Sequence, residues 1–402
     1  MRFVPPTGAP LRMTDILHSV AARNGRSKKD LAAVAGRLRV KHVFAASSGR
    51  AALWLALVSL HRLRPDRNTV AIPAYTCFSV PAAVVRAGLK ILPVEVDPKT
   101  LDFDSRQLAA LPETKLLCIV PCNLFGFPND ASKIRNAARA RGAYVVDDAA
   151  QALGSTCDGQ RAGTLGDVGV YSLGRGKAVG SVAGGLLVTD SDDIAAMIDS
   201  EGVALTKSSA TQGAELLLKM LSYSLLLHPR LFWVPNSLPF LKLGTTEFEP
   251  SFVTAQMHPF SLALLEPLLG ELEQINQIRR ANVKAITDGL AENHSFVFPK
   301  PRVNSQPTFV RLPVLARDHA TRNRAVALLR NAGIGATPFY PTAICDIPCI
   351  EKHMCKRDFH CSQTEELSRR LFTLPTHPYV QRRDIERMVY ILTSLLGGRE
   401  SQ

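Results

Sequence analysis

The sequence predicts an α/β protein with a mostly parallel sheet and a smaller α/β unit toward its C-terminal end. Three observations support this prediction: strand-like and helix-like segments alternate as far as Asp190, the strand-like segments are unbroken apolar runs, and the pattern changes after that residue. Such alternation indicates βαβ units, and parallel strands covered on both faces have continuous apolar sequences. With 402 residues, the chain is long enough for two packed units.

The strand-like runs are short and rich in β-branched residues, and amphipathic segments separate several of them. Apolar positions in those segments recur at helical spacing. The predicted strands are residues 69–73, 90–96, 116–121, 143–147, 168–173 and 185–189, and the predicted helices between them are residues 49–63, 80–87 and 131–141.

The rest of the chain predicts a long helix followed by the smaller unit. The helical pattern runs from about residue 259 to 293, a strand follows at 308–314, and helices follow at 320–332 and 383–396. We therefore divide the chain into residues 1–270, which include an apolar insertion at 213–246, and a C-terminal unit of residues 271–402.

The charge balance favours an anionic partner. Lys and Arg total 48 against 35 Asp and Glu, which gives a formal charge of +13, and such an excess suits a phosphorylated cofactor, a nucleotide or a membrane surface. The basic residues are scattered and no nucleic-acid-binding motif is present, so we expect no nucleic-acid partner. No run of about 18 uncharged apolar residues occurs, and residues 1–15 have no signal-peptide core. These features predict a cytoplasmic protein.

Cysteine and histidine gather in one short segment, which contains Cys345, Cys349, His353, Cys355, His360 and Cys361. Thiolate and imidazole are zinc ligands, but no C-x-x-C pair occurs. The eight cysteines of a chain of this length do not form a disulfide scaffold. We therefore expect reduced cysteines without metal, in a surface loop, and we leave a metal site open as the alternative.

The residues with the clearest chemical character follow two predicted strands. Asp147 and Asp148 lie where one strand ends, Ser172 lies at the end of the next, and Lys177 follows among glycines. Ligands of open α/β sheets bind at the carboxyl ends of the strands. A carboxylate there can pair with a protonated pyridine nitrogen, and a lysine amine can attack an aldehyde to form an imine. This combination is what pyridoxal phosphate requires of a protein.

The sequence resembles the DegT/StrS-type nucleotide-sugar aminotransferases, a branch of the fold-type I pyridoxal phosphate enzymes. The resemblance covers most of the chain and is most specific in VVDDAAQALGS (145–155), followed by GDVGVYSLGRGKAVGSVAGG (166–185). Further matching stretches are KHVFAASSGRAALWLAL, NLFGFP, LLRNAGIGATPFYP and RRLFTLPTHPYVQRRDIERM.

The resemblance implies a role for each matching position. Lys177 would form the Schiff base and move protons during the transamination, and Asp148 would pair with the pyridinium nitrogen. Gln151 would face the phenolic oxygen, and Ser172, Ser48 and Gly49 would bind the phosphate at a helix N-terminus. No metal is implied.

Four positions depart from the family pattern. Arg50 replaces the usual Thr after Ser-Gly, and the place of the ring-stacking aromatic is taken by Cys77, with Phe78 next to it. Phe339 replaces a His, and Thr254 replaces the Asn that reaches the phosphate of a neighbouring subunit. We keep Arg50, Cys77 and Phe78 as candidate cofactor contacts, since the changes affect the expected substrate and the shared dimer site rather than the cofactor.

The implied function is transfer of an amino group, from glutamate as the expected donor, to a keto group of a nucleotide-linked sugar in polysaccharide or glycoconjugate biosynthesis. The implied assembly is a homodimer. The alternatives are an aminotransferase for a lipid-linked or other non-nucleotide keto substrate, and a regulatory homologue that binds the cofactor without turnover. A dehydratase of the same fold would carry His in place of Lys177.

Residues 215–244 form a leucine-rich stretch interrupted by Pro229, Pro235 and Pro239. Its apolar residues would cover more of a helix than the single stripe that a surface helix buries, and its prolines prevent one long helix. One interpretation is a segment packed against the rest of the chain or across a dimer. The other is a surface that meets a lipid-like substrate or lies at the inner face of a membrane, with Trp233, Lys219, Arg230 and Lys242 at the headgroups.

Overall fold

The computed structural model describes residues 2–21, 27–112, 114–238, 244, 246–293, 295–356 and 360–395. Its central feature is a sheet of seven strands in the order β1-β9-β8-β5-β4-β2-β3. Their bounds are β1 His42–Ala46, β2 Thr69–Pro73, β3 Lys90–Val94, β4 Leu116–Ile119, β5 Tyr144–Asp148, β8 Val168–Ser172 and β9 Gly185–Thr189.

The sheet is mainly parallel, as predicted. β3, β2, β4, β5 and β8 pair in parallel, whereas β9 pairs antiparallel with both β8 and β1. The buried strands have the expected apolar sequences; all five residues of β2 and of β9, for example, are buried. Because the parallel strands run in one direction, the residues that follow β4, β5 and β8 meet at one edge of the sheet.

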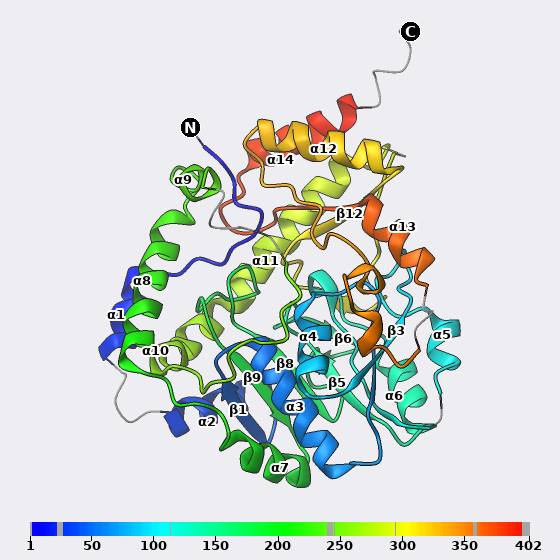
Figure 1. The fold of residues 1–402 in the computed structure, drawn as a ribbon. Coiled ribbons are helices and arrows are strands. Elements are labelled where there is room, and N and C mark those ends of the chain that lie inside the picture. Colours follow the sequence, from blue (N-terminus) through cyan, green and yellow to red (C-terminus); the bar gives the residue numbers. More distant parts are fainter. Residues whose placement is uncertain are drawn as a thin grey trace.

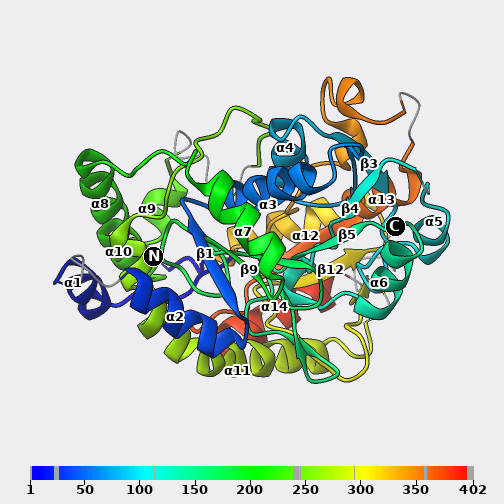
Figure 2. The same cartoon turned by 90° about the horizontal axis from the view of Figure 1, so that it is seen from below.

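Helices cover both faces of this sheet, and Figure 2 shows β1 between α3 and α7 on one side and α2 and α11 on the other. α3 begins after Ser48 and packs its alanine- and leucine-rich face on β8 and β9. The bounds are α2 Ser27–Leu38, α3 Gly49–Leu63, α4 Ser79–Arg86, α5 Ser105–Ala109, α6 Ala131–Arg139, α7 Asp192–Gly202, α10 Pro259–Ala263 and α11 Leu265–Gly289.

A second, three-stranded antiparallel sheet lies toward the C-terminal end, with the order β10-β12-β13. Figure 1 shows α12 and α14 beside it, at the opposite end of the molecule from α7. The bounds are β10 Phe296–Val297, β12 Leu312–Ala316, β13 Leu371–Leu374, α12 His319–Asn331, α13 Ser362–Arg370 and α14 Arg382–Ser394. The expected boundary between residues 270 and 271 falls inside α11, and the division into two domains stays a prediction.

The long helix predicted over residues 259–293 is interrupted at Leu264, where α10 ends and α11 begins. The predicted helical pattern is confirmed over residues 259–289, with Leu264 between the two helices and an end four residues earlier than predicted. Its periodicity was read correctly, because Leu264, Leu265 and Leu268 all reach the same core.

The chain from residue 210 to 238, called here the α8–α9 segment, stands beside α1 (Met13–Ala21) in Figure 1. It contains α8 (Ala210–Leu226) and the short α9 (Trp233–Asn236). Among the described residues, no helix is both long and apolar enough to cross a membrane. The predicted contributions of Phe240, Leu241 and Lys242 lie outside the described residues.

The cysteine-rich segment differs from its prediction in two ways. Cys345 and Cys361 form a disulfide, so the expectation that all cysteines are reduced was wrong. The segment is also not simply a surface loop, because Ile347, Ile350 and Met354 are buried in the main core. Within the described residues, no group of His, Cys, Asp and Glu is arranged to hold a metal ion.

A third, small sheet joins residues that are distant in the sequence. β11 (Ser305–Gln306) pairs with β6 (Thr156–Cys157), which in turn pairs with β7 (Gln160–Arg161). The chain between β10 and β12 is thereby attached to the loop that follows Asp148.

Candidate functional site

Asp148 occupies the last position of β5, at the edge where the parallel strands end. Its side chain is buried, and its oxygens have different partners: Oδ1 accepts from the Ala150 N–H at 2.9 Å, and Oδ2 lies 3.6 Å from the Cys122 thiol. Burial raises the pKa of Asp148, while the Ala150 N–H, the Lys177 ammonium and Cys122 act in the opposite direction. Lys177 therefore lies close enough to act on this carboxylate.

Asp147, the preceding residue, points to the other side of the strand and has a different environment. Its carboxylate accepts hydrogen bonds from Asn123 Nδ2 at 2.7 Å and from the N–H groups of Gly163 and Leu165 at 2.6 and 3.1 Å. These three donors use its acceptor positions to hold the turn after β7. Asp147 thus accepts three hydrogen bonds within the protein, whereas Asp148 accepts one from an N–H group and one from a thiol, and the role of Asp148 toward a ligand stays a prediction.

Lys177 lies in a loop that leaves the end of β8 and returns toward β9. The loop is pinned where Gly174 pairs with Val182 and where Ser181 N–H donates to the Leu173 carbonyl at 3.1 Å. The side chain of Lys177 is partly exposed.

Ser48, Gly49 and Ser172 form a small polar cradle at the N-terminus of α3. A Cβ added to Gly49 would lie 2.6 Å from Ser172 Cβ, and one added to Gly185 would lie 2.4 Å from the Ser48 carbonyl group, so only glycine allows these segments to approach. Ser48 Oγ accepts from the Ala51 N–H at 3.1 Å. The N–H groups of Gly49 and Arg50 have no partner within the helix, and they suit an anion.

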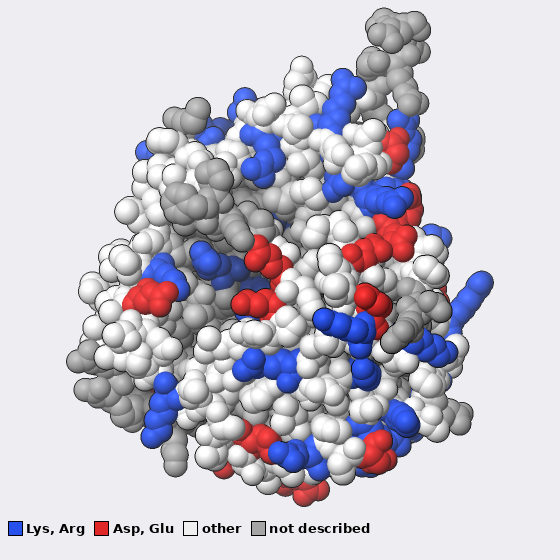
Figure 3. Space-filling model, in the orientation of Figure 1, with Lys and Arg blue, Asp and Glu red and all other residues white. Residues whose placement is uncertain are grey.

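Together, Ser48, Gly49, Asp148, Ser172 and Lys177 are called the strand-end site below. Each was predicted as a site residue, and the structure brings all five to the ends of β5 and β8 and the start of α3. Figure 3 shows a hollow on the face of Figure 1, left of centre, with basic side chains inside it and acidic side chains at its rim.

Gln151 lies beside this site, although its side chain is occupied within the protein. Its Oε1 accepts from the Phe125 N–H at 3.2 Å, and its Nε2 donates to the Tyr340 hydroxyl at 2.9 Å. Tyr340 is buried against the ring of Tyr75. Burial raises the pKa of Tyr340 well above its ordinary value, and the nearby Asp148 carboxylate acts in the same direction, so its hydroxyl stays protonated at neutral pH.

The structure places the other predicted contacts less directly. Arg50 directs its guanidinium over the Phe252 ring at 4.5 Å and toward Glu249, so its side chain contacts the 247–254 loop rather than the cradle. Cys77 is partly buried and packs against the main core, whereas Phe78, the residue before α4, is buried within that core. A stacking contact from Cys77 or Phe78 stays a prediction.

The remaining departures from the family pattern also have defined positions. Phe339 packs on Phe125 with ring centroids 4.8 Å apart, and the Arg311 guanidinium lies 4.9 Å over its ring. Thr254 Oγ1 accepts from Arg86 at 3.4 Å, so it helps to fix the same loop that Arg50 contacts.

Tyr340 and Asn123 were not predicted as functional neighbours. Asn123 follows a predicted strand and belongs to the NLFGFP stretch, so its position at a strand end was a usable signal. Tyr340 had no such signal, because it is 189 residues from Gln151 in the sequence and only the tertiary fold brings the two together.

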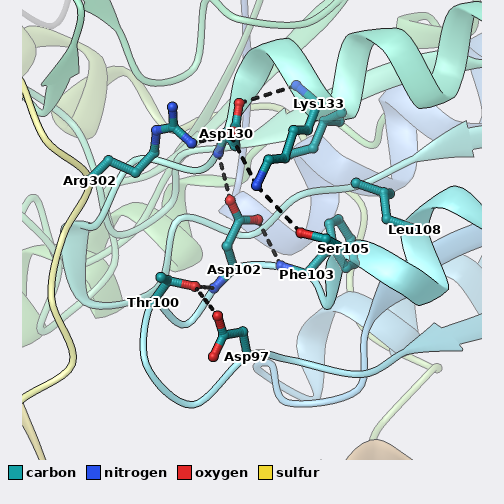
Figure 4. Close-up of a pocket in the computed structure, with 10 residues that line it drawn as sticks. Asp97, Thr100, Asp102, Phe103, Ser105, Leu108, Asp130, Lys133 and Arg302 are labelled. Atoms are coloured by element: carbon teal, nitrogen blue, oxygen red, sulfur yellow. Dashed lines mark hydrogen bonds and ion pairs between the residues drawn. The ribbon is translucent and has the colours of Figure 1, made fainter.

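A separate polar pocket lies between α5 and α6, away from the strand-end site (Figure 4). Asp102 accepts from the Asp130 N–H at 2.6 Å, and the Asp130 carboxylate forms ion pairs with Arg302 and Lys133. Because these charged groups satisfy one another, we interpret the pocket as the place where the chain around Arg302 attaches to the main sheet's helices.

Comparison with known proteins agrees with this geometry. A model of the DegT/DnrJ/EryC1/StrS aminotransferase family matches residues 11–393. The chain is 34% identical over 157 residues to GDP-perosamine synthase of Caulobacter vibrioides, a match that covers 39% of this chain and 42% of that protein. It is 33% identical over 181 residues to UDP-N-acetyl-3-dehydro-alpha-D-glucosamine 3-aminotransferase of Acidithiobacillus ferrooxidans, covering 44% and 47% of the two. The chain thus spans less than half the length of these curated relatives.

The solved structure of E. coli GDP-4-keto-6-deoxy-D-mannose-3-dehydratase with bound hydrated PLP is similar over 98% of this chain and 100% of that one. Its TM-score is 0.77 and its sequence identity is 16%. This similarity is one of fold, and it confirms the fold-type I class predicted from the sequence.

Proposed function

We propose that this chain, which belongs to the DegT/DnrJ/EryC1/StrS aminotransferase family, is a pyridoxal-phosphate-dependent aminotransferase for a keto group of a nucleotide-linked sugar. Glutamate is the proposed amino donor, and polysaccharide or glycoconjugate biosynthesis is the proposed setting. The observation that carries the proposal is the placement of the buried Asp148 carboxylate at the end of β5, where the charge of Lys177, from the loop after β8, acts on it.

The residues present fit pyridoxal phosphate. The strand-end site offers an amine at Lys177, a carboxylate at Asp148 and an anion cradle at Ser48, Gly49 and Ser172, which are the three features that the aldehyde, ring nitrogen and phosphate of this cofactor need. The cradle is too narrow for any residue but glycine at position 49, as expected where the main chain approaches a phosphate. Lys177 would hold the cofactor covalently through Nζ.

Pyridoxal phosphate, when bound, supplies an electron sink for the electron pair released when a substrate C–H bond breaks. The Asp148 carboxylate would keep a proton on the ring nitrogen by pairing with it. Lys177 Nζ, once released, would take the proton from the donor carbon and deliver it to the second carbon of the transamination, on the other side of the imine nitrogen. Gln151 and Tyr340 would hold the side of the site through their mutual hydrogen bond.

The nucleotide-linked substrate is supported by the two curated relatives, whose names specify a GDP-linked and a UDP-linked sugar. It is also supported by the formal charge of +13, because an excess of basic side chains favours a ligand with phosphate groups. A keto substrate linked to a lipid is the alternative within the same chemistry. A regulatory homologue without turnover is less well supported, because Lys177 and Asp148 are both present.

A half-reaction screen tests this proposal. The protein would be loaded with pyridoxal phosphate and treated with glutamate, and the loss of visible absorbance would be recorded. Addition of a GDP- or UDP-linked keto sugar should restore that absorbance, whereas Lys177→Ala should show neither change. If keto sugars without a nucleotide restore it and the nucleotide-linked ones do not, the substrate class is wrong.

Two further parts of the proposal concern assembly and place. We propose a homodimer with composite active sites, on the basis of the family resemblance, and we place the shared region at the 247–254 loop, which contains Thr254 and is held by Arg50 and Arg86. Full activity of a monomer in sedimentation and assay at one concentration would contradict it.

We also propose a peripheral contact of the α8–α9 segment with the inner face of a membrane. Leu218, Leu225 and Trp233 expose 65%, 60% and 41% of their surface, and Lys219 and Arg230 are exposed near them. Apolar side chains flanked by cations suit the boundary of an anionic bilayer.

A further inference from the structure

A buried arginine on α11, Arg279, contacts the main chain of the loop that carries Lys177. Its side chain has no exposed surface. Nη1 donates to the Ala178 carbonyl at 3.0 Å, and Nη2 donates to the Lys177 carbonyl at 3.4 Å. The guanidinium therefore holds two successive peptide groups, one of which belongs to Lys177 itself.

The same guanidinium is fixed from its other side. Nη1 also donates to Asn276 Oδ1 at 3.0 Å, and Nη2 donates to the Gly8 carbonyl at 3.2 Å. The preceding residue, Thr7, donates from Oγ1 to the Gly176 carbonyl at 3.2 Å. The N-terminal segment and α11 thus hold residues 176–178 from two directions.

Arg279 is a buried cation whose partners are neutral oxygens. In the described part of the chain, no carboxylate forms an ion pair with it. Burial lowers the pKa of Arg279 to about 10, partly opposed by Tyr223, so the guanidinium stays charged at neutral pH. An apolar side chain of similar size generally packs a core at least as well as a buried charge does. Packing alone therefore does not explain an arginine whose planar donors match the carbonyls of one loop.

We propose that Arg279 is a positioning residue for Lys177, an inference that rests on the proposed role of Lys177 in holding the cofactor. The loop contains Gly174, Gly176 and Gly180, and a chain with these glycines has many accessible conformations. Charge-assisted hydrogen bonds to the carbonyls of Lys177 and Ala178 restrict the loop to the conformation seen in the structure, in which the charge of Lys177 acts on the Asp148 carboxylate. The loop is thereby ordered before the cofactor arrives, which lowers the entropy that binding must overcome.

Three variants test this role: Arg279→Met removes the donors, Arg279→Lys keeps the charge without the planar fork, and Arg67→Met is the matched control. Arg67 also donates to two main-chain carbonyls, those of Leu116 and Arg141 at 2.8 and 2.7 Å, but at the opposite end of the sheet. The first measurement is hydrogen exchange of peptides covering residues 173–182 in the cofactor-free protein. The second is the affinity for pyridoxal phosphate, with covalent attachment at Lys177 scored by borohydride reduction and mass spectrometry.

We expect Arg279→Met to weaken cofactor affinity about 10- to 100-fold, since two charge-assisted hydrogen bonds are lost. Hydrogen exchange should accelerate in the loop but not in the main sheet. Arg279→Lys should have a cofactor affinity and a loop exchange rate between those of the wild type and Arg279→Met. Arg67→Met should lower thermal stability and leave cofactor affinity unchanged. A residue that only fills the core would instead raise exchange throughout the region around α11.

The outcomes separate this inference from the function on which it rests. If the wild type shows no covalent attachment at Lys177, the proposed function fails. If the wild type is labelled there and Arg279→Met has wild-type affinity and loop exchange, only the role of Arg279 is overturned. Should Arg279→Met not fold, wild-type values for Arg279→Lys would overturn it equally.

Discussion

The strand-end site and the α8–α9 segment use burial in opposite ways. In the strand-end site, the buried side chain of Asp148 is polar and its two oxygens have separate partners. In α8, Leu216 and Met220 are buried while Leu218 and Leu225 are largely exposed. A carboxylate stays buried only where specific groups compensate its desolvation, so its position depends on identifiable contacts. A leucine-rich helix can bury any of its faces. Its composition therefore predicts that part of the helix is covered, but it does not identify the covered face or the partner.

Loss of Lys177 should produce the largest effect on turnover, because the strand-end site would no longer be catalytically active. Lys177→Ala removes both the covalent attachment and the proton-transfer group, and general acid–base catalysis alone contributes roughly 10²- to 10⁴-fold. We expect turnover with glutamate and a keto sugar to fall by at least about 10³-fold, with loss of the yellow colour. Lys284→Ala on α11, which removes only an exposed ion pair with Asp288, is the control. Wild-type turnover in Lys177→Ala would refute the mechanism.

The two adjacent aspartates should differ next most strongly. Asp148→Asn removes the charge that would keep the ring nitrogen protonated, and we expect a loss in kcat of about 10²-fold or more, as for other groups that stabilise charge in a reaction. Asp147→Asn should lose less than about 10-fold once folded, because Asp147 contacts Asn123, Gly163 and Leu165 rather than the site. Steady-state assays on both variants check this, and equal losses would mean that the functional aspartate is misassigned.

The free energy of unfolding should change in the opposite order, with a larger loss in Asp147→Asn than in Asp148→Asn. Asp147→Asn places an amide donor against N–H donors, and a buried unsatisfied group costs about 1–3 kcal/mol. In the cofactor-free protein, Asp148→Asn should be neutral or stabilising at pH 7, because burial raises the pKa of the Asp148 carboxyl and its ionised form is disfavoured.

The pH dependence has a definite sign. A carboxyl whose pKa is raised in the folded state contributes favourably at low pH, and that contribution is lost as the pH rises through the raised value. The stability gain of Asp148→Asn over the wild type should therefore shrink as the pH is lowered. Urea unfolding between pH 5 and 8 measures it, and a gain that grows toward low pH would contradict the assignment.

Sequence reasoning reached most of the strand-end site because its residues follow strands at short range. Asp148, Ser172 and Lys177 could each be placed at a strand end from apolar runs and glycine spacing. The partners of Gln151 and Lys177 could not, because Tyr340 and Arg279 come from distant segments that meet only in the folded chain. The direction of Arg50 depends on the 247–254 loop, which no local pattern placed.

The same limit explains the errors elsewhere. The strands of the main sheet were largely predicted, apart from β1, whose sequence His42–Ala46 is short and half-buried. The Cys345–Cys361 disulfide was missed because no local pattern shows that two residues 16 positions apart lie with their Cα atoms 6.4 Å from each other. In each case the deciding contact is between segments that the sequence pattern does not connect.

The smallest effect on turnover is expected in the α8–α9 segment. Variants there should distinguish a segment whose exposed side chains meet a membrane from one that is packed in the core or in a chain–chain interface. Trp233→Ala and Leu225→Ser alter exposed side chains, so stability should change by less than about 0.5 kcal/mol. If the segment meets a membrane, both should reduce flotation with anionic liposomes several-fold at low salt, because apolar insertion and electrostatic attraction act together. Met220→Ala is the matched control from the buried face of α8; it should cost about 2–5 kcal/mol without changing flotation of the folded protein. If the wild type stays entirely in the soluble fraction, and Trp233→Ala alters only thermal stability, the segment belongs to the core or to a chain–chain interface.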